Sequence, residues 1–257
     1  MEMTCIGCDE TIAADGLNDL GLAFLRHVRA AHVDMPYSDM AIRNFAEATQ
    51  RLTGPGERLD RIEELEVHPV TDDRIDDWLH LFDHDGFVGW PQWAACYCTE
   101  PHVAEPGAED EHDAHWTENR HLMVDRLREG RTSGYLGYVG GRPAAWVNAS
   151  LRSEYALYRA GPGSEPSDES VVGISCFVVA PPYRRHGVAG ALLDRVLADA
   201  AGRGAAWVEA YPFLPSTSIE PQADFRGPRA LYDARGFEQV AERARDVVVR
   251  RRPASTS

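Results

Sequence analysis

Two groups of residues in this sequence could do chemistry, and the first is a set of cysteines and histidines near the amino terminus. Cys5 and Cys8 are separated by two residues, and His27 and His32 are separated by four. Thiolate and imidazole ligands at such spacings are typical of structural Zn²⁺ sites. The 18 residues between Cys8 and His27 exceed the spacing of about a dozen that is usual in small zinc fingers. The sequence predicts a Zn²⁺ site formed by these four residues, and the alternative is a helix that carries two histidines by coincidence.

The second group is a basic, glycine-containing segment in the second half of the chain, and its chemistry would be anion binding. A glycine-containing turn that opens a helix leaves backbone N–H groups unpaired at the positive end of the helix dipole, where phosphate groups bind. Gly187 and Ala189 have small side chains that let a phosphate approach the backbone. Taken alone, the pattern also fits an ordinary turn. The predicted phosphate-binding residues are Arg184, Arg185, His186, Gly187, Val188, Ala189 and Gly190.

Two other nucleotide-binding motifs are missing from the sequence. It contains neither the G-x-G-x-x-G fingerprint of dinucleotide-binding proteins at this turn nor the G-K-[ST] ending of a phosphate loop.

The elements that would position the turn alternate between strands and helices. Strand 171–180 ends just before it, helix 188–201 follows it, and strand 206–211 comes next. Further strands are expected at 65–70, 135–139, 144–149, near 239 and at 247–249, and further helices at 71–82, 116–127 and 229–234. This alternation predicts an α/β (α+β) fold.

Composition and motifs divide the chain into four parts. Residues 1–36 form the zinc-finger-like module, a small helical unit for which a bound metal would supply most of the folding energy. Residues 37–61 hold a helix from Ser38 to Leu52 and a Gly-Pro-Gly linker. The large domain spans 62–252, and 253–257 are expected to form a disordered tail.

Three blocks of the large domain resemble the GNAT superfamily of N-acetyltransferases. The first runs from strand 177–179 through the pattern R-x-x-G-x-A at 184–189 into the next helix, and it is similar to the family's acetyl-CoA motif. Block 207–211 looks like the next family strand, and block 230–237 looks like the closing helix, which ends in Gly-Phe. The resemblance extends over residues 62–251. One departure is Phe225, which stands where many members have an asparagine, so a cofactor contact of that asparagine is not carried over.

The resemblance implies a GNAT fold, in which a mixed central sheet is splayed at the cofactor site, and acetyl-CoA as the cosubstrate. The pantetheine arm would lie in the gap and pair with the backbone of Phe177, Val178 and Val179 like an added strand. The N–H of Val178 would face the thioester carbonyl and stabilise the developing oxyanion. Residues 185–190 would hold the pyrophosphate.

Two side chains match catalytic residues of some family members. Glu209 would accept the proton of the attacking amine, directly or through a water, because an amine with a pKa near 10 is mostly protonated at neutral pH. Tyr232 would protonate the departing CoA thiolate. The alternatives are a solvent-facing strand residue for Glu209 and a packed helix aromatic for Tyr232. Cys176 lies mid-strand and is expected to be a buried structural thiol, not a nucleophile.

Charge and hydrophobicity restrict the partners. The formal net charge is −15, from 26 basic and 41 acidic residues, which disfavours nucleic acid and is compatible with an amine substrate. The amino-terminal module is also acidic, unlike a DNA-reading finger. No apolar run approaches the roughly 20 residues of a membrane span, and no signal segment opens the chain. Cytoplasm is therefore the expected location, with no membrane partner.

These features together predict an acetyl-CoA-dependent N-acyltransferase that acetylates an amine of a small molecule or peptide by direct attack on the thioester. The alternative is an acetyl-CoA-binding regulatory protein whose finger recruits a partner. Cys96 and Cys98, with His102, His112 and His115 nearby, are a second and less typical metal pattern. Trp90, Trp93 and Tyr97 in the same segment are expected to shape the acceptor pocket, because substrates of the family that the chain resembles usually enter over this side of the domain. The oligomeric state is left open and includes a homodimer.

Overall fold

The computed structural model describes residues 2–5, 7–15, 17–34, 42, 58–87, 91–103, 116–165, 170–214 and 224–253. The predicted helix from Ser38 to Leu52, the linker after it and residues 254–257 of the predicted tail lie outside the described residues, apart from Ile42. The domain boundaries given above therefore stay predictions.

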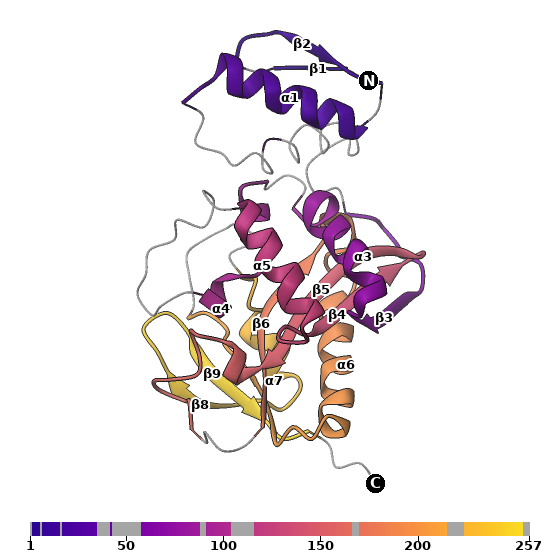
Figure 1. Cartoon of the computed structure of the whole chain (residues 1–257). Coiled ribbons are helices and arrows are strands. Elements are labelled where there is room, and N and C mark those ends of the chain that lie inside the picture. Colours follow the sequence, from indigo (N-terminus) through magenta and orange to yellow (C-terminus); the bar gives the residue numbers. More distant parts are fainter. Residues whose placement is uncertain are drawn as a thin grey trace.

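A seven-stranded sheet forms the centre of the large domain (Figure 1). Its strands are β3 (Leu65–Pro69), β4 (Gly134–Val139), β5 (Arg142–Leu151), β6 (Val171–Val179), β7 (Trp207–Ala210), β8 (Glu238–Glu242) and β9 (Val247–Arg251). They lie in the order β3-β4-β5-β6-β7-β9-β8, and every pair is antiparallel except β6 and β7, which are parallel. The predicted mixed sheet is confirmed.

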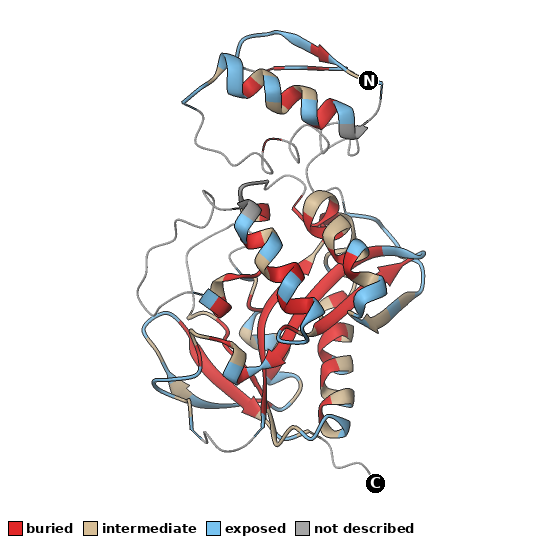
Figure 2. Cartoon of the chain, viewed as in Figure 1, coloured by how far each residue is buried: buried red, intermediate tan, exposed pale blue. Residues whose placement is uncertain are grey.

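The hairpin between β4 and β5 shows how local sequence sets the register of the sheet. Gly140 and Gly141 both have positive φ, 57° and 74°, the combination that a tight primed turn requires and that glycine adopts without strain. The turn places Val139 opposite Arg142. The sheet is buried on both faces along β5 (Figure 2).

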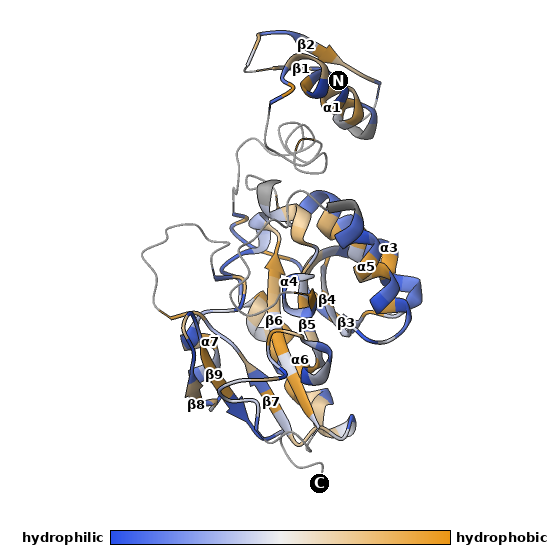
Figure 3. Ribbon diagram, turned by 60° about the vertical axis from the view of Figure 1, so that its left-hand side comes forward, coloured by the Kyte–Doolittle hydropathy of each residue, from blue (hydrophilic) through white to orange (hydrophobic). Residues whose placement is uncertain are grey.

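Helices cover the two faces of the sheet and enclose two hydrophobic clusters. One cluster packs α3 (Ile75–His80) and α5 (Trp116–Arg128) against side chains such as Trp146 and Val178. The other packs α6 (Val188–Gly202) and α7 (Arg229–Asp233) against the opposite face. Figure 3 shows β6 between them as a strand of mostly hydrophobic residues. A strand buried on both sides is mostly apolar, which explains the nearly continuous apolar run that predicted it.

Several short elements were not predicted. Helix α3 continues as one π-helical turn over Leu81–Asp85, a 3₁₀ helix spans Pro91–Cys96, and α4 has only four residues, Glu100–Val103. Such turns carry too few residues to display a period in sequence.

The amino-terminal residues form a separate ββα arrangement. Strands β1 (Glu2–Thr4) and β2 (Thr11–Ala13) are antiparallel, and α1 (Leu17–Ala31) follows them (Figure 1). Their small core includes Met3, Ile12, Leu20, Phe24 and Val28. Within the described residues, no helix has both the length and the apolar character needed to cross a bilayer.

Candidate functional site

The turn before α6 has the backbone conformation of an anion-binding loop. Arg185 and Gly187 both have left-handed φ, 67° and 79°, and turns of alternating handedness direct successive amides at one anion. The first hydrogen bond of α6 runs from the N–H of Ala191 to the carbonyl of Gly187, at 3.0 Å. The N–H groups of residues 188–190 therefore have no acceptor within the helix. A Cβ on Gly187 would meet no atom within 4 Å, so the space beside this glycine is open.

The side chains that flank the turn brace it. The Nε of Arg184 donates to the carbonyl of Val179 at 2.8 Å, and the Nε2 of His186 lies 2.8 Å from the carbonyl oxygen of Leu59. The turn is thereby tied both to the end of β6 and to the segment that leads into β3.

Beside this turn, the sheet opens between β6 and β7. The two strands pair over only four residues each, from Val171 opposite Trp207 to Ile174 opposite Ala210. Beyond Ile174, β6 continues to Val179 with β5 as its only strand partner among the described residues. The splayed sheet implied by the resemblance is present, and its gap runs along residues 175–179 of β6.

Backbone groups of β6 alternate between its two edges, and the alternation identifies the groups that face the gap. The N–H of Ala180 donates to Ala144 on the β5 side at 2.9 Å. In an antiparallel ladder every second residue bonds the same neighbour, so the N–H of Val178 also points to β5. The expectation that this N–H faces a thioester carbonyl is wrong, because the β5 ladder uses it. Phe177 and Val179 face the gap instead.

One of the gap-facing N–H groups already has a partner within the chain. The N–H of Phe177 donates to the carbonyl of Phe225 at 2.5 Å, and the hydroxyl of Tyr232 donates to the next carbonyl, that of Arg226, at 2.5 Å. Gly227 follows with a φ of 83°, and a Cβ there would lie 2.8 Å from the Tyr232 hydroxyl. Residues 225–227 therefore bridge from β6 to α7 across the gap. Phe225 is the departure from the family pattern noted in the sequence.

A buried arginine fixes this bridge. Arg226 is 3% exposed, and its guanidinium donates to Asp246 at 2.7 Å and to Glu100 at 2.8 Å. It also lies over the ring of Phe213, 4.2 Å from the centroid. Three segments that are distant in sequence are thereby joined beside the gap.

The two predicted catalytic residues are both buried, in different surroundings. Tyr232 lies on α7 beside the gap, and burial raises the pKa of its hydroxyl. Glu209 lies on β7, where one carboxylate oxygen accepts from Arg152 at 3.2 Å and from Arg250. Its other oxygen accepts from the Tyr211 hydroxyl at 2.7 Å. Glu209 is not the solvent-facing residue that the sequence allowed, and an amine could reach it only if this network opened.

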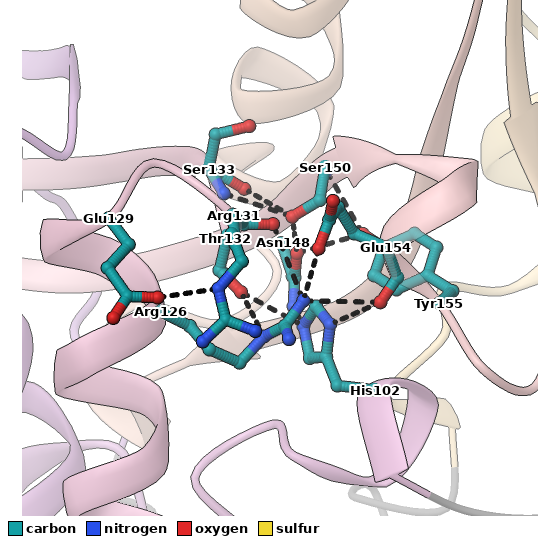
Figure 4. Close-up of polar contacts among 10 residues, drawn as sticks. All are labelled: His102, Arg126, Glu129, Arg131, Thr132, Ser133, Asn148, Ser150, Glu154 and Tyr155. Carbon is teal, nitrogen blue, oxygen red and sulfur yellow. Dashed lines mark hydrogen bonds and ion pairs between the residues drawn. The ribbon is translucent and has the colours of Figure 1, made fainter.

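A polar network around His102 joins α4 to β5 and to the end of α5 (Figure 4). The ring of His102 on α4 has its Nδ1 3.1 Å from the carbonyl of Glu154 and its Nε2 near Thr132 (3.3 Å) and the amide nitrogen of Asn148 (3.1 Å). Burial lowers the pKa of His102 to about 3, so the ring is neutral, donates from Nδ1 and accepts at Nε2. With both nitrogens engaged, His102 is a support and not a metal ligand.

The four amino-terminal residues predicted to bind metal are brought together. Their ligand atoms all lie within 4.8 Å of one another. The Sγ of Cys5 is 3.3 Å from the Nε2 of His32, and the Sγ of Cys8 is 3.3 Å from the Nε2 of His27. Ligands about 2.0–2.3 Å from a tetrahedral Zn²⁺ lie at roughly such separations. Across the part of the chain that the structure describes, no second such cluster is found, and Cys96 and Cys98 do not form one.

Two further contacts make the cluster resemble a built metal site. The Nδ1 of His27 lies 3.3 Å from the Glu10 carboxylate, the contact that orients a histidine when its other nitrogen binds metal. A Cβ on Gly7 would come 2.8 Å from the ring of His32, so a glycine between the two cysteines lets that ring approach. The sequence reasoning named the ligands but missed these supporting residues.

Comparison with known proteins adds the family. The model of the acetyltransferase (GNAT) family matches residues 71–216, which is more than half of the 257 residues. The chain belongs to the GNAT acetyltransferase family. A search of curated proteins found no significant match.

Solved structures of other acetyltransferases are similar to this GNAT enzyme at low identity. An aminoglycoside N-acetyltransferase, AAC(6')-Iy, in complex with CoA has 18% identity over 72% of this chain and 95% of its own, with a TM-score of 0.40. The PaiA N-acetyltransferase of Thermoplasma acidophilum, in complex with coenzyme A, has 8% identity over 74% and 99%, with a TM-score of 0.46. A predicted acetyltransferase with acetyl-CoA from Clostridium acetobutylicum has 13% identity over 70% and 94%, with a TM-score of 0.41. Identities this low carry no information on the acceptor.

Proposed function

We propose that this GNAT enzyme transfers the acetyl group of acetyl-CoA to the amine of a small molecule or peptide. The observation that carries the proposal is the start of α6, where the N–H groups of residues 188–190 have no acceptor within the helix and lie at an open position next to the only parallel strand pair of the described sheet. Amides at a helix N-terminus suit a pyrophosphate. Arg184 and Arg185 add positive charge in a chain whose net charge is −15.

The pantetheine arm would take the gap along β6. Its amides would pair with the groups of Phe177 and Val179 that face away from β5, as an added strand does. Because the N–H of Phe177 is bonded to Phe225, the carbonyl of Phe225 must move aside or be replaced when the arm enters. The freed N–H of Phe177 then replaces Val178 as our candidate for the donor to the thioester oxygen.

The catalytic role we retain is that of Tyr232. Its hydroxyl lies at the gap and donates to the carbonyl of Arg226, a bond that it can exchange for one to the CoA sulfur. Burial raises the pKa of this hydroxyl, so stabilising the thiolate by a hydrogen bond suits Tyr232 better than giving up its proton outright. The role of Glu209 as base, expected from the resemblance, requires its network to open, and we infer that Glu209 braces β7 instead.

We also propose that Cys5, Cys8, His27 and His32 hold a structural Zn²⁺. The set of two thiolates and two imidazoles is typical of closed structural zinc sites. The acidic surface of this unit fits a contact with protein better than one with nucleic acid.

The test uses two glycines at opposite ends of one helix. Gly187 begins α6 and Gly204 follows it, with φ of 79° and 73°, and a Cβ at either would meet nothing within 4 Å. Alanine should strain both sites by a similar amount, about 1 kcal/mol. Gly187→Ala should weaken coenzyme A binding by about tenfold in calorimetry because its amides move, whereas Gly204→Ala should leave the affinity within about twofold. Equal affinities in the two variants would contradict the assignment of the pyrophosphate site.

Turnover is measured separately, as thiol release from acetyl-CoA over a panel of amines. The chain contains no lysine, so acetylation of its own lysine side chains gives no background. Tyr232→Phe should lower turnover by about 10²-fold with little change in coenzyme A affinity. Tyr138→Phe is the control, because its hydroxyl bonds Asp77 on α3. Coenzyme A binding without turnover on any amine would favour the regulatory alternative.

A further inference from the structure

Two cysteines that the proposed reaction does not use lie in direct contact beside the gap. The Sγ of Cys98 is 2.7 Å from the Sγ of Cys176, although 78 residues separate them in sequence. Ordinary nonbonded contacts lie at roughly 3.5–4.0 Å, and a disulfide at about 2.05 Å. The two sulfurs are therefore within about 0.7 Å of bonding distance.

The backbone around Cys98 is held in an uncommon conformation that produces this contact. Tyr97 and Cys98 are consecutive non-glycine residues with left-handed φ, 47° and 59°. Such conformations are unfavourable for residues with a side chain and persist only where the surroundings enforce them. The Tyr97 hydroxyl donates to Asp83 at 2.6 Å, and its ring stacks on Phe82 with centroids 5.7 Å apart. This anchoring turns the next residue, Cys98, toward β6.

Both cysteines lie in segments that hydrogen bonds hold in place. Cys176 lies in β6, opposite Asn148 of β5. Cys98 leads into α4, where the N–H of His102 donates to the carbonyl of Thr99 at 2.8 Å and the His102 ring joins the network of Figure 4. Neither element needs to travel for the remaining distance to close.

We propose that Cys98 and Cys176 form a redox modification site, which a small two-electron oxidant of the peroxide class closes to a disulfide. One thiolate attacks a peroxide oxygen, giving a sulfenic acid and, after protonation of the leaving hydroxide, water. The second sulfur then attacks the sulfenic sulfur, forms the S–S bond and releases a second water. In sum, two thiols and one hydrogen peroxide give one disulfide and two waters. This inference does not depend on the proposed acetyl transfer.

Burial decides what kind of oxidant can act. Cys98 is 3% exposed and Cys176 is 7% exposed, so a bulky disulfide reagent cannot reach them without opening of the segment. Burial also raises the pKa of the Cys98 thiol well above its ordinary value, which makes oxidation slow, because the thiolate is the reactive form. The neighbouring sulfur then captures the sulfenic acid before further oxidation.

The test is peptide mapping of the full-length, zinc-loaded protein in the Cys96→Ser background. Trypsin cleaves after Arg74 and Arg120 and after Arg159 and Arg184, so the two peptides of interest, 75–120 and 160–184, then carry only Cys98 and only Cys176. After incubation with hydrogen peroxide, we expect one cross-linked species of these peptides, two hydrogens lighter than their sum, which dithiothreitol separates. The oxidised protein should also melt at least about 5 °C higher, because the bond closes a long loop.

Variants make the result specific. Cys98→Ser and Cys176→Ser should each abolish the cross-link, whereas the background substitution at Cys96, whose thiol pKa burial also raises to about 12, should not. The proposal is overturned if both peptides remain free thiols, or become separate sulfinic acids, while the Cys5 and Cys8 thiols of metal-free protein oxidise under the same conditions. Misfolding of Cys98→Ser or Cys176→Ser would not affect this outcome, since the decisive sample retains both of these cysteines.

Discussion

The amino-terminal unit and the acetyltransferase domain differ in the groups that form their proposed binding sites. In the amino-terminal unit four side chains converge on one point above a core of few buried residues. In the domain the proposed cofactor site consists of backbone amides, on a sheet whose two faces are packed by two large hydrophobic clusters. A unit of the first kind depends on its ligand for stability, whereas one of the second kind is stable before a ligand arrives.

Removing the proposed metal should have the largest effect, and it should unfold the amino-terminal unit while leaving the acetyltransferase domain intact. Structural Zn²⁺ contributes roughly 10–16 kcal/mol to small finger units, more than the small core around Phe24 can replace. Chelation, or Cys5→Ser, should therefore unfold residues 2–34, seen as loss of their helical signal and rapid proteolysis. Coenzyme A affinity of the domain should change little.

Cys96→Ser is the matched control, because it removes a thiol that belongs to no metal cluster among the described residues. If metal removal left the proteolysis rate of residues 2–34 unchanged, or abolished coenzyme A binding, the contrast between the two units would fail.

The next largest effect is expected at the buried ion pairs of Glu209, inside the domain. Glu209→Ala would leave Arg152 and Arg250 buried without their carboxylate, which costs about 3–5 kcal/mol. The control, Glu129→Ala, removes an exposed partner of Arg131 and should cost less than about 1 kcal/mol. Urea unfolding followed by tryptophan fluorescence measures both.

Glu209→Gln tests the alternative role of the same residue. If Glu209 were the catalytic base, this variant would fold normally and lose about 10²–10⁴-fold in turnover. If Glu209 only braces β7, the Glu209→Gln variant should be less stable, and its turnover should fall only in proportion to the fraction of protein that is folded.

The difference between the units also explains how far the sequence could predict them. The sequence could predict that Cys5, Cys8, His27 and His32 lie together, because their residue types and spacings are those typical of metal ligands. The turn at Gly187 and the strands around it were readable because glycine positions and apolar runs encode local structure. The sequence could not show which amides of β6 face the gap, because that depends on the register of β5 against β6. The resemblance suggested the N–H of Val178, whereas the pairing with β5 leaves the N–H of Phe177 facing the gap.

Long-range contacts were the other part that the sequence could not supply. The bridge of Phe225 and Arg226, the partners of Glu209 and the contact between Cys98 and Cys176 join residues from distant segments, and nothing local to each residue signals them. The support of His102 was missed for the same reason, since its partners Thr132, Asn148 and Glu154 come from other elements.

The smallest expected effect concerns the pH dependence that His102 adds to the domain. Its folded pKa of about 3 lies below the ordinary value of 6.5, so the unfolded chain binds a proton between these values and the folded chain does not. The stabilisation is fully present above pH 6.5 and is lost as the pH falls toward 3. At about 1.4 kcal/mol per pH unit, the stabilisation lost between pH 6.5 and pH 5 is about 2 kcal/mol.

Urea unfolding at pH 7 and pH 5 isolates this contribution when the wild type is compared with His102→Gln, which keeps a donor and an acceptor but does not titrate. The variant should be less stable at pH 7 and should lose less stability between the two values, and the difference of the two losses is the contribution of His102. Parallel losses in both proteins would mean that the ring is protonated in the folded state. The network of Figure 4 would then have to accept a proton at Nε2, where Thr132 and Asn148 now donate.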